Sequence, residues 1–250
     1  MMKDGGIDVV LLQETKKSSM DEEFIKQMWP FEKMEFMGKD AEGTTGGLLC
    51  IWNPDRFRLK ECCSSRQFVM LSGIVGVDFK WTIVNIYAPN NVVKRRQLWD
   101  ALGRLKTHYT NPWCVGGDFN EIRYISERNG CSRKNRGMTD FNGLIDQLSL
   151  MDLPMLGRSF TWCNAQDGER WSRIDRFLLD SRWLEEYSFK QWGLPRNISD
   201  HCPILLKEDV RNWGSKPIRF INAWLLHPKF KVEVKSLGRK LLIQDRLDSD

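Results

Sequence analysis

Few of the features that mark membrane, secreted or zinc-stabilised proteins occur in this chain. No apolar run approaches the roughly 20 residues that cross a bilayer, and the opening MMKDGG contains no apolar signal-peptide core. The seven cysteines form no C-x-x-C pair and are odd in number, so neither a zinc site nor a disulfide framework is indicated. We therefore expect reduced thiols, a nuclear or cytoplasmic location and no membrane association. Nothing in the sequence indicates an oligomeric state.

The composition is that of a soluble globular protein. Of the 250 residues, 41% are hydrophobic and 28% are charged, which excludes an intrinsically disordered chain. The net charge of +5 permits a polyanionic partner without requiring one. The 11 tryptophans suit either a large core or a base-stacking surface, and the core is the favoured interpretation.

Short apolar and β-branched runs between turn signals predict a protein rich in strands. Strands are expected at residues 7–13, 48–52, 57–62, 68–75, 81–87, 113–115, 160–163, 170–179, 189–193 and 203–207. Helices are expected at residues 21–29, 94–109, 140–150 (capped by Thr139) and 181–186, with a surface loop at 121–137 and a hairpin turn at 164–169.

Many strands with few helices between them predict an α/β (α+β) fold. The expected architecture is a four-layer α/β sandwich, in which two mixed β-sheets pack face to face between helices. Residues 1–206 are predicted to form this domain. Residues 207–250 change in character and are predicted to form a linker or connector, with a basic helix at 230–242.

Polar side chains follow the ends of apolar runs that lie far apart in the sequence. They are Glu14, Asp118 with Asn120, Asp175, and Asp200 with His201. Each group lies where a buried strand reaches its rim, and such distant rims can meet only in one folded site. This pattern suits a metal-assisted attack on a phosphodiester.

The first of these residues also have plainer interpretations. Glu14 suits Mg²⁺, which takes one or two carboxylates plus water and phosphate oxygens, but an acidic strand end can simply face solvent. Asp118 can accept a proton from water that Asn120 holds, although an Asx-rich turn also explains this pair. Tyr87 ends a strand, where its hydroxyl either contacts the scissile phosphate or packs in the core.

The pair Asp200–His201 is the sharper signal. A histidine beside an aspartate and before a strand can donate a charged hydrogen bond to a phosphoryl oxygen. A distant carboxylate must then hold the imidazole ring, and Asp175 is the candidate. Because Asp175 lies between Arg173 and Arg176, salt bridges to these arginines are the alternative.

Five motifs in this order resemble the hallmarks of the endonuclease/exonuclease/phosphatase superfamily. They are LLQET (11–15), NIYAPN (85–90), GGDFNEI (116–122), SRIDRFLLD (172–180) and SDHCPILL (199–206), and the resemblance covers about residues 7–206. RSFTWCN (158–164) and WSRIDR (171–176) look most like the endonuclease of plant non-LTR (LINE-type) retrotransposons. WGSKPIRF (213–220) and WLLHP (224–228) are similar to their connector toward a reverse transcriptase.

The resemblance implies a divalent-metal-dependent DNA endonuclease that leaves a nick with a 3′-hydroxyl. Glu14 would bind Mg²⁺ or Mn²⁺, and Asp200 would assist at the metal or leaving-group side. Asp118 would orient and deprotonate the attacking water, which Asn120 would position.

At the phosphate, the resemblance implies that His201, paired with Asp175, stabilises charge. Tyr87 and Asn90 would contact the phosphate. In a LINE element the nick primes reverse transcription, so DNA and the reverse transcriptase domain of the parent element are the implied partners.

A basic loop follows the Asp118 segment. We expect Arg133, Lys134 and Arg136 to grip the DNA backbone, although short basic runs are more often solvated faces.

The chain departs from the family pattern at its start. The family places a strand ending in an asparagine before the LLQET strand, whereas here Met1 almost directly precedes Ile7. We therefore expect an N-terminally truncated domain with an exposed sheet edge and one metal partner fewer. Two alternatives remain: a catalytically impaired remnant that only folds or binds DNA, and another phosphoesterase of the superfamily, such as an abasic-site endonuclease.

Overall fold

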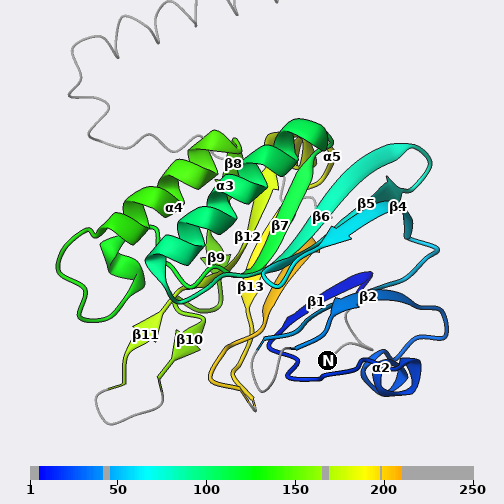
Figure 1. Cartoon of the computed structure of the whole chain (residues 1–250), viewed down its shortest axis with the longest axis horizontal. Helices are drawn as coiled ribbons and strands as arrows, with labels where there is room; N and C mark the ends of the chain where they lie inside the picture. Colours follow the sequence, from blue (N-terminus) through cyan, green and yellow to red (C-terminus); the bar gives the residue numbers. More distant parts are fainter. Residues whose placement is uncertain (1–5, 42–45, 165–168, 198, 210–250) are drawn as a thin grey trace, which may run out of the picture. The chain divides into compact units, whose positions relative to one another are not determined.

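A mixed six-stranded sheet forms the centre of the protein (Figure 1). The structure, a computed structural model, describes residues 6–41, 46–164, 169–197 and 199–209. In the central sheet β6 and β7 are parallel and the other neighbours are antiparallel. Its strands, in spatial order, are β4 (Phe57–Ser64), β5 (Phe68–Val75), β6 (Phe79–Tyr87), β7 (Trp113–Asp118), β12 (Asp175–Asp180) and β8 (Leu150–Asp152).

Two three-stranded sheets make up the second β layer. One has the order β1 (Val9–Gln13), β3 (Leu48–Trp52), β2 (Glu35–Lys39), and the other β14 (Ile204–Glu208), β13 (Phe189–Gly193), β9 (Met155–Leu156). Both β1 and β14 are edge strands, and every residue of β1 is partly exposed, whereas the central β3 is buried throughout. A separate short ribbon pairs β10 (Trp162–Cys163) with β11 (Trp171–Ser172).

The alternation of side chains along β3 explains how the layers stack. Leu48, Cys50 and Trp52 pack against residues of the six-stranded sheet. Leu49 and Ile51 point the other way and pack against α2 (Glu22–Met28). Successive side chains of a strand alternate between faces, so β3 packs against the six-stranded sheet with one face and against α2 with the other.

The opposite face of the six-stranded sheet is covered by α3 (Val92–His108) and α4 (Arg136–Gln147) (Figure 1). Leu98 and Leu102 of α3 and Phe141 of α4 share one apolar cluster with β-sheet residues such as Val84. The short α5 (Ser181–Glu186) follows β12 and buries Trp183. The order helix, sheet, sheet, helix confirms the four-layer α/β sandwich.

The start of α4 corrects the prediction. Thr139 was expected to cap a helix at 140–150, but the helix begins at Arg136, and the Asn135 side chain accepts a hydrogen bond from the backbone N–H of Met138. Asn is a strong capping residue, and the glycine at 137 does not prevent the helix from starting there. The loop predicted at 121–137 therefore ends earlier, and it contains the short 3₁₀ helix η1 (Ile125–Glu127).

The strand predicted at 170–179 is interrupted in the structure. It forms β11 and β12, and the residues between them, Arg173 and Ile174, belong to neither strand. The strand predicted at 113–115 continues through both glycines to Asp118. Strands β2, β8 and β9 had no clear apolar alternation and were not predicted.

The predicted hairpin at 164–169 agrees with the antiparallel pairing of β10 and β11, while its turn lies outside the described residues. From residue 210 onward the predicted connector and the basic helix at 230–242 also lie outside them. In the described ranges, no helix is both long enough and apolar enough to span a membrane.

Candidate active site

Three neighbouring strands bring the candidate residues together at one end of the six-stranded sheet. Asp118 is the last residue of β7, and Asp175 is the first residue of β12. The two residues are direct partners in the antiparallel ladder, and Tyr87 at the end of β6 is the partner of Asp118 on its other side. Register alone therefore gathers side chains that lie 31 to 88 positions apart in numbering.

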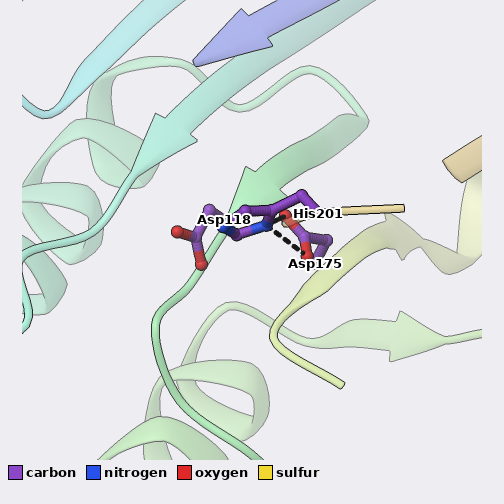
Figure 2. A group of neighbouring side chains, drawn as sticks. All are labelled: Asp118, Asp175 and His201. Atoms are coloured by element: carbon purple, nitrogen blue, oxygen red, sulfur yellow. Dashed lines mark hydrogen bonds and ion pairs between the residues drawn. The ribbon is translucent and has the colours of Figure 1, made fainter. Parts of the chain in front are cut away.

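His201 reaches this sheet end from the segment before β14. Its Nδ1 lies 3.0 Å from both carboxylate oxygens of Asp175. One potential ligand atom from each of Asp118, Asp175 and His201 lies within 4.8 Å of the other two. Figure 2 shows these three side chains clustered, with His201 directed at Asp175. Arg173 and Arg176 ion-pair with Glu127 and Asp152 instead of Asp175.

The protonation of His201 follows from this contact. Burial alone would lower the pKa of the imidazole, but the hydrogen bond and negative charge of Asp175 raise it to about 9. His201 is therefore a cation at neutral pH, and a carboxylate holds its Nδ1–H. The ring can present positive charge to an anion.

The environment of Asp118 disfavours the ionised form of its carboxyl group. Asp118 is only 3% exposed. Burial, and after it the negative charge of Asp175, raises the pKa of the Asp118 carboxyl to about 8. The backbone N–H of Asn120 donates to Asp118 Oδ1 at 2.8 Å, and the Asn120 side chain donates to Oδ2 at 3.1 Å. A bound cation would offset this buried negative charge, so the donor set fits a divalent metal.

The backbone conformation at Asn120 places its side chain within hydrogen-bond distance of the Asp118 carboxylate. Asn120 adopts a left-handed φ of 49°, which asparagine tolerates better than most residues, and its side chain also donates to the Ala88 carbonyl at 2.7 Å. Gly117 has a φ of 134°, and a Cβ at this position would lie 2.1 Å from the Ile86 carbonyl oxygen. The glycine is therefore required where β7 passes close to β6.

Glu14 lies at the rim of the same site. It also has a left-handed φ, 52°, and its carboxylate accepts a hydrogen bond from the Tyr87 hydroxyl. Burial and then this contact raise the pKa of Tyr87, so its hydroxyl stays protonated. Lys16 lies 3.5 Å from Glu14 in an exposed ion pair, which a metal ion could replace.

Asp200 faces the site from beside His201. Its Oδ2 accepts a hydrogen bond from Trp162 Nε1 at 2.9 Å. Burial opposes ionisation, but the Trp162 contact and the His201 charge together hold the pKa of Asp200 below its usual range. Asp200 is therefore an anion beside the imidazolium.

Thr161, for which the sequence indicated no role in the site, helps to hold this arrangement in place. The hydroxyl oxygen of Thr161, a fully buried residue, accepts hydrogen bonds from the backbone N–H groups of Ile174 and Asp175, both at 3.0 Å. The Thr161 carbonyl accepts the N–H of Cys202, the residue after His201. Thr161 thus fixes both halves of the His201–Asp175 pair.

A second support is a buried ion pair between Arg95 and Glu121. Arg95 donates to Glu121 at 2.6 Å and to the carbonyls of Pro89 and Asn90 at 3.0 and 2.8 Å. Position 137 beside this pair accepts only glycine, because a Cβ there would lie 1.9 Å from a Glu121 oxygen. Arg95 belongs to the basic run Lys94-Arg95-Arg96, yet it is 5% exposed and holds the loop at Asn90 against the segment after Asn120.

The basic residues predicted to bind DNA lie at the protein surface. Arg133 and Lys134 are exposed in the loop before α4, and Arg136 is exposed at its first turn. Asn90 is exposed three residues after Tyr87 in the chain.

The free energy of unfolding should depend on the charge of His201. Its folded pKa of about 9 exceeds the 6.5 of a free histidine side chain, so its contribution is fully present below about pH 6.5 and is lost as the pH rises through about 9. We expect the difference in free energy of unfolding between the wild type and His201→Gln to shrink across this window. Urea unfolding at several pH values measures it, and a difference that is constant with pH would refute the charged pair.

A family model matches residues 1–201 and is described as the Endonuclease/Exonuclease/phosphatase family. The chain belongs to this family. Members of the endonuclease/exonuclease/phosphatase family are phosphoesterases and nucleases that use divalent metals. No curated protein matches the chain significantly.

Solved structures of endonuclease/exonuclease/phosphatase type share the fold. The endonuclease domain of TRAS1, a telomere-specific non-LTR retrotransposon, is 14% identical, with a TM-score of 0.61 over 84% of this chain and 90% of that one. The 3′ phosphatase NExo from Neisseria, bound to a product DNA hairpin, is 16% identical, with a TM-score of 0.66 over 83% and 91%. The catalytic domain of Xenopus laevis APE2 is 16% identical, with a TM-score of 0.59 over 80% and 83%. These identities establish a common fold alone.

Proposed function

We propose that this chain is a divalent-metal-dependent DNA endonuclease that hydrolyses a phosphodiester and leaves a 3′-hydroxyl. The observation that carries the proposal is the convergence of Asp118 with the His201–Asp175 pair. A buried carboxylate that can take a proton lies beside an imidazolium that can meet an anion. Water activation and phosphate charge stabilisation need these two groups together.

The metal would be held by Glu14 and Asp200 next to Asp118. Glu14 suits this role because its carboxylate is partly exposed and its present cationic neighbour is a surface lysine. Mg²⁺ or Mn²⁺, when bound, supplies positive charge to the phosphate oxygens.

The protein's own residues carry the proton and orient the reactants. With a divalent metal bound nearby, the raised pKa of Asp118 would fall and its carboxylate would be ionised. Asp118 then accepts a proton from the attacking water, which Asn120 positions, and the water oxygen forms a bond to phosphorus. The bond from phosphorus to O3′ breaks, and O3′ takes up a proton from a solvent water on the side of the ionised Asp200. The products are a 5′-phosphate and a 3′-hydroxyl.

Charge on the phosphoryl oxygens is met by neighbouring donors. His201, held by Asp175 through Nδ1, donates to a phosphoryl oxygen. The Tyr87 hydroxyl and the Asn90 amide contact the same phosphate. These contacts strengthen as negative charge develops, so they favour the transition state over the bound substrate.

We further propose that the parent of this chain is a LINE-type retrotransposon, in which a reverse transcriptase uses the 3′-hydroxyl as a primer. The motifs at 158–164 and 171–176 support this origin. The shared fold with the TRAS1 endonuclease domain is consistent with it.

A comparison of substrates tests the activity against its alternatives. Duplex oligonucleotides with and without one abasic site are incubated with the protein and Mg²⁺, and a polymerase is then used to extend the products. Cleavage of intact duplex with extendable ends supports the proposal. Cleavage confined to the abasic site indicates a repair-type endonuclease, and metal-independent binding without cleavage indicates a non-catalytic remnant.

The basic loop gives a separate prediction. Each Lys or Arg that neutralises a phosphate contributes about 0.9 to the slope of log affinity against log salt. Changing Arg133, Lys134 and Arg136 together to alanine should therefore flatten this slope, and fluorescence anisotropy with labelled duplex measures it. Lys60, Arg66 and Lys80, all outside this loop, provide a control triple variant. An unchanged slope in the loop variant would remove the loop from the DNA-binding surface.

A further inference from the structure

The ribbon formed by β10 and β11 carries a recess that the catalytic groups do not use. The recess has a volume of about 320 Å³ and is lined by Arg158, Ser159, Phe160 and Trp171. The ribbon projects from the main sheets (Figure 1). On its inner side, Thr161 and Ser172 are buried, while Phe160 and Trp171 remain partly exposed. One side of the ribbon therefore supports the catalytic site and the other offers aromatic surface.

The recess lies close to the segment that carries His201. Trp162 forms a β-bridge with His201, and its indole holds Asp200. Arg158 donates to Cys202 Sγ at 3.8 Å, so the lining of the recess touches the residue after His201. A DNA strand with its phosphate at His201 would thus have its neighbouring nucleotides close to the recess.

The chemistry of the recess combines aromatic rings with positive charge. The guanidinium of Arg196 lies over the Trp171 ring, 5.7 Å from its centroid. Arg158 lines the recess and Arg196 lies over one of its rings, so both place positive charge there. One carboxylate, Glu169, accepts a hydrogen bond from the Trp171 indole at 3.1 Å. The planar Arg196 guanidinium shows that a flat group fits over this ring, and a base that stacks there would replace it and leave the guanidinium able to meet a phosphate.

We infer that the recess binds an unstacked nucleobase of the DNA strand that is cut, an inference that rests on the proposed endonuclease function. The Trp171 ring supplies the stacking surface, and Arg158 and Arg196 meet the adjoining phosphates. Aromatic stacking accepts any base, while arginine charge selects a polyanion over an uncharged aromatic ligand. The recess therefore favours DNA that is unpaired or easily unstacked beside the cut.

Two variants of Trp171 test the inference, with 2-aminopurine placed next to the cleavage position of a labelled oligonucleotide. Trp171→Ala should weaken DNA binding about tenfold and abolish the change in 2-aminopurine fluorescence on binding. Trp171→Phe keeps an aromatic face and should retain most of both. Binding is measured with EDTA present, so that the readout needs no turnover.

Hydrolysis of bis(p-nitrophenyl) phosphate, which has no nucleobase, serves as the internal control. Unchanged hydrolysis of this substrate by Trp171→Ala, with impaired DNA binding, supports the recess. Equal loss on both substrates would make Trp171 a structural residue and overturn the inference. DNA binding as tight as wild type in Trp171→Ala would also overturn it and leave the recess to a different partner.

The inference and the proposed function can fail separately. If the wild type hydrolyses neither substrate, the proposed activity fails. A fluorescence change that depends on Trp171 would then still support nucleobase binding, and its absence would overturn it.

Discussion

Asp118→Asn should slow DNA nicking by about 10²–10⁴-fold, the range over which general base catalysis contributes. Asparagine has nearly the same shape and keeps an oxygen that can accept the Asn120 N–H, which lies 2.8 Å away in the wild type. Its amide cannot take a proton from water. Single-turnover cleavage of a labelled duplex measures the loss.

The same variant should not lose stability. Burial and the charge of Asp175 raise the folded pKa of Asp118 from 3.8 to about 8, so the folded state binds this proton more tightly than the unfolded state. Wild-type stability therefore falls as the pH rises from about 4 to about 8, and Asp118→Asn lacks that loss. Asp100→Asn, an exposed carboxylate on α3, is the matched control and should change neither property. Metal-dependent cleavage at near wild-type rate in Asp118→Asn would refute the base assignment.

Arg176→Met should lower the free energy of unfolding by about 3–5 kcal/mol, because it removes one partner of a buried charge network. The Arg176 side chain is completely buried and donates to Glu127 at 2.9 and 3.2 Å and to Asp152 at 2.7 Å. Methionine fills much of the volume of the arginine side chain, but it leaves the Glu127 and Asp152 carboxylates with one cationic partner fewer. Urea unfolding gives the loss directly.

A surface arginine provides the comparison. Arg182 pairs with Asp180 at 2.7 Å, but its side chain is 46% exposed. Arg182→Met should cost at most about 1 kcal/mol, since exposed pairs contribute little. Equal losses for the two variants would show that the Arg176 network does not stabilise the fold. The Arg176 effect should also reach the active site, because Asp175 is the adjacent residue.

The layered fold was predictable because its strands are continuous apolar runs. Residues 48–52 and 68–75 contain almost no polar side chains, and the structure buries them between layers. Strand β2, with a glycine and two charged ends, gives no such signal and forms because β3 pairs with it. The start of α4 was missed because two capping residues, Asn135 and Thr139, compete within four positions.

The clustering of site residues was partly predictable because each lies at a strand end. Asp118 and Asp175 could be expected at one rim, but only the register of β7 and β12 makes them direct partners. Asp175 pairs with His201, and not with Arg173 or Arg176, because Glu127 and Asp152 lie where they can bind the two arginines. That information belongs to the tertiary structure.

The supporting residues could not be recognised from sequence. Arg95 lies in a basic run that normally faces solvent, and only the fold reveals Glu121 beside it. Thr161 is a common strand residue whose role depends on two backbone N–H groups of a distant segment. Trp171 likewise becomes informative only when Arg196 and the recess are seen beside it.

Nicking of supercoiled plasmid by the folded chain, in Mg²⁺ and in EDTA, tests the central claim most directly. The proposed mechanism predicts relaxed circles in Mg²⁺, none in EDTA and nicking slowed by about 10²–10⁴-fold with Asp118→Asn. Intact supercoiled plasmid after incubation of the folded wild type with Mg²⁺ would contradict it, as would nicking at near wild-type rate by Asp118→Asn.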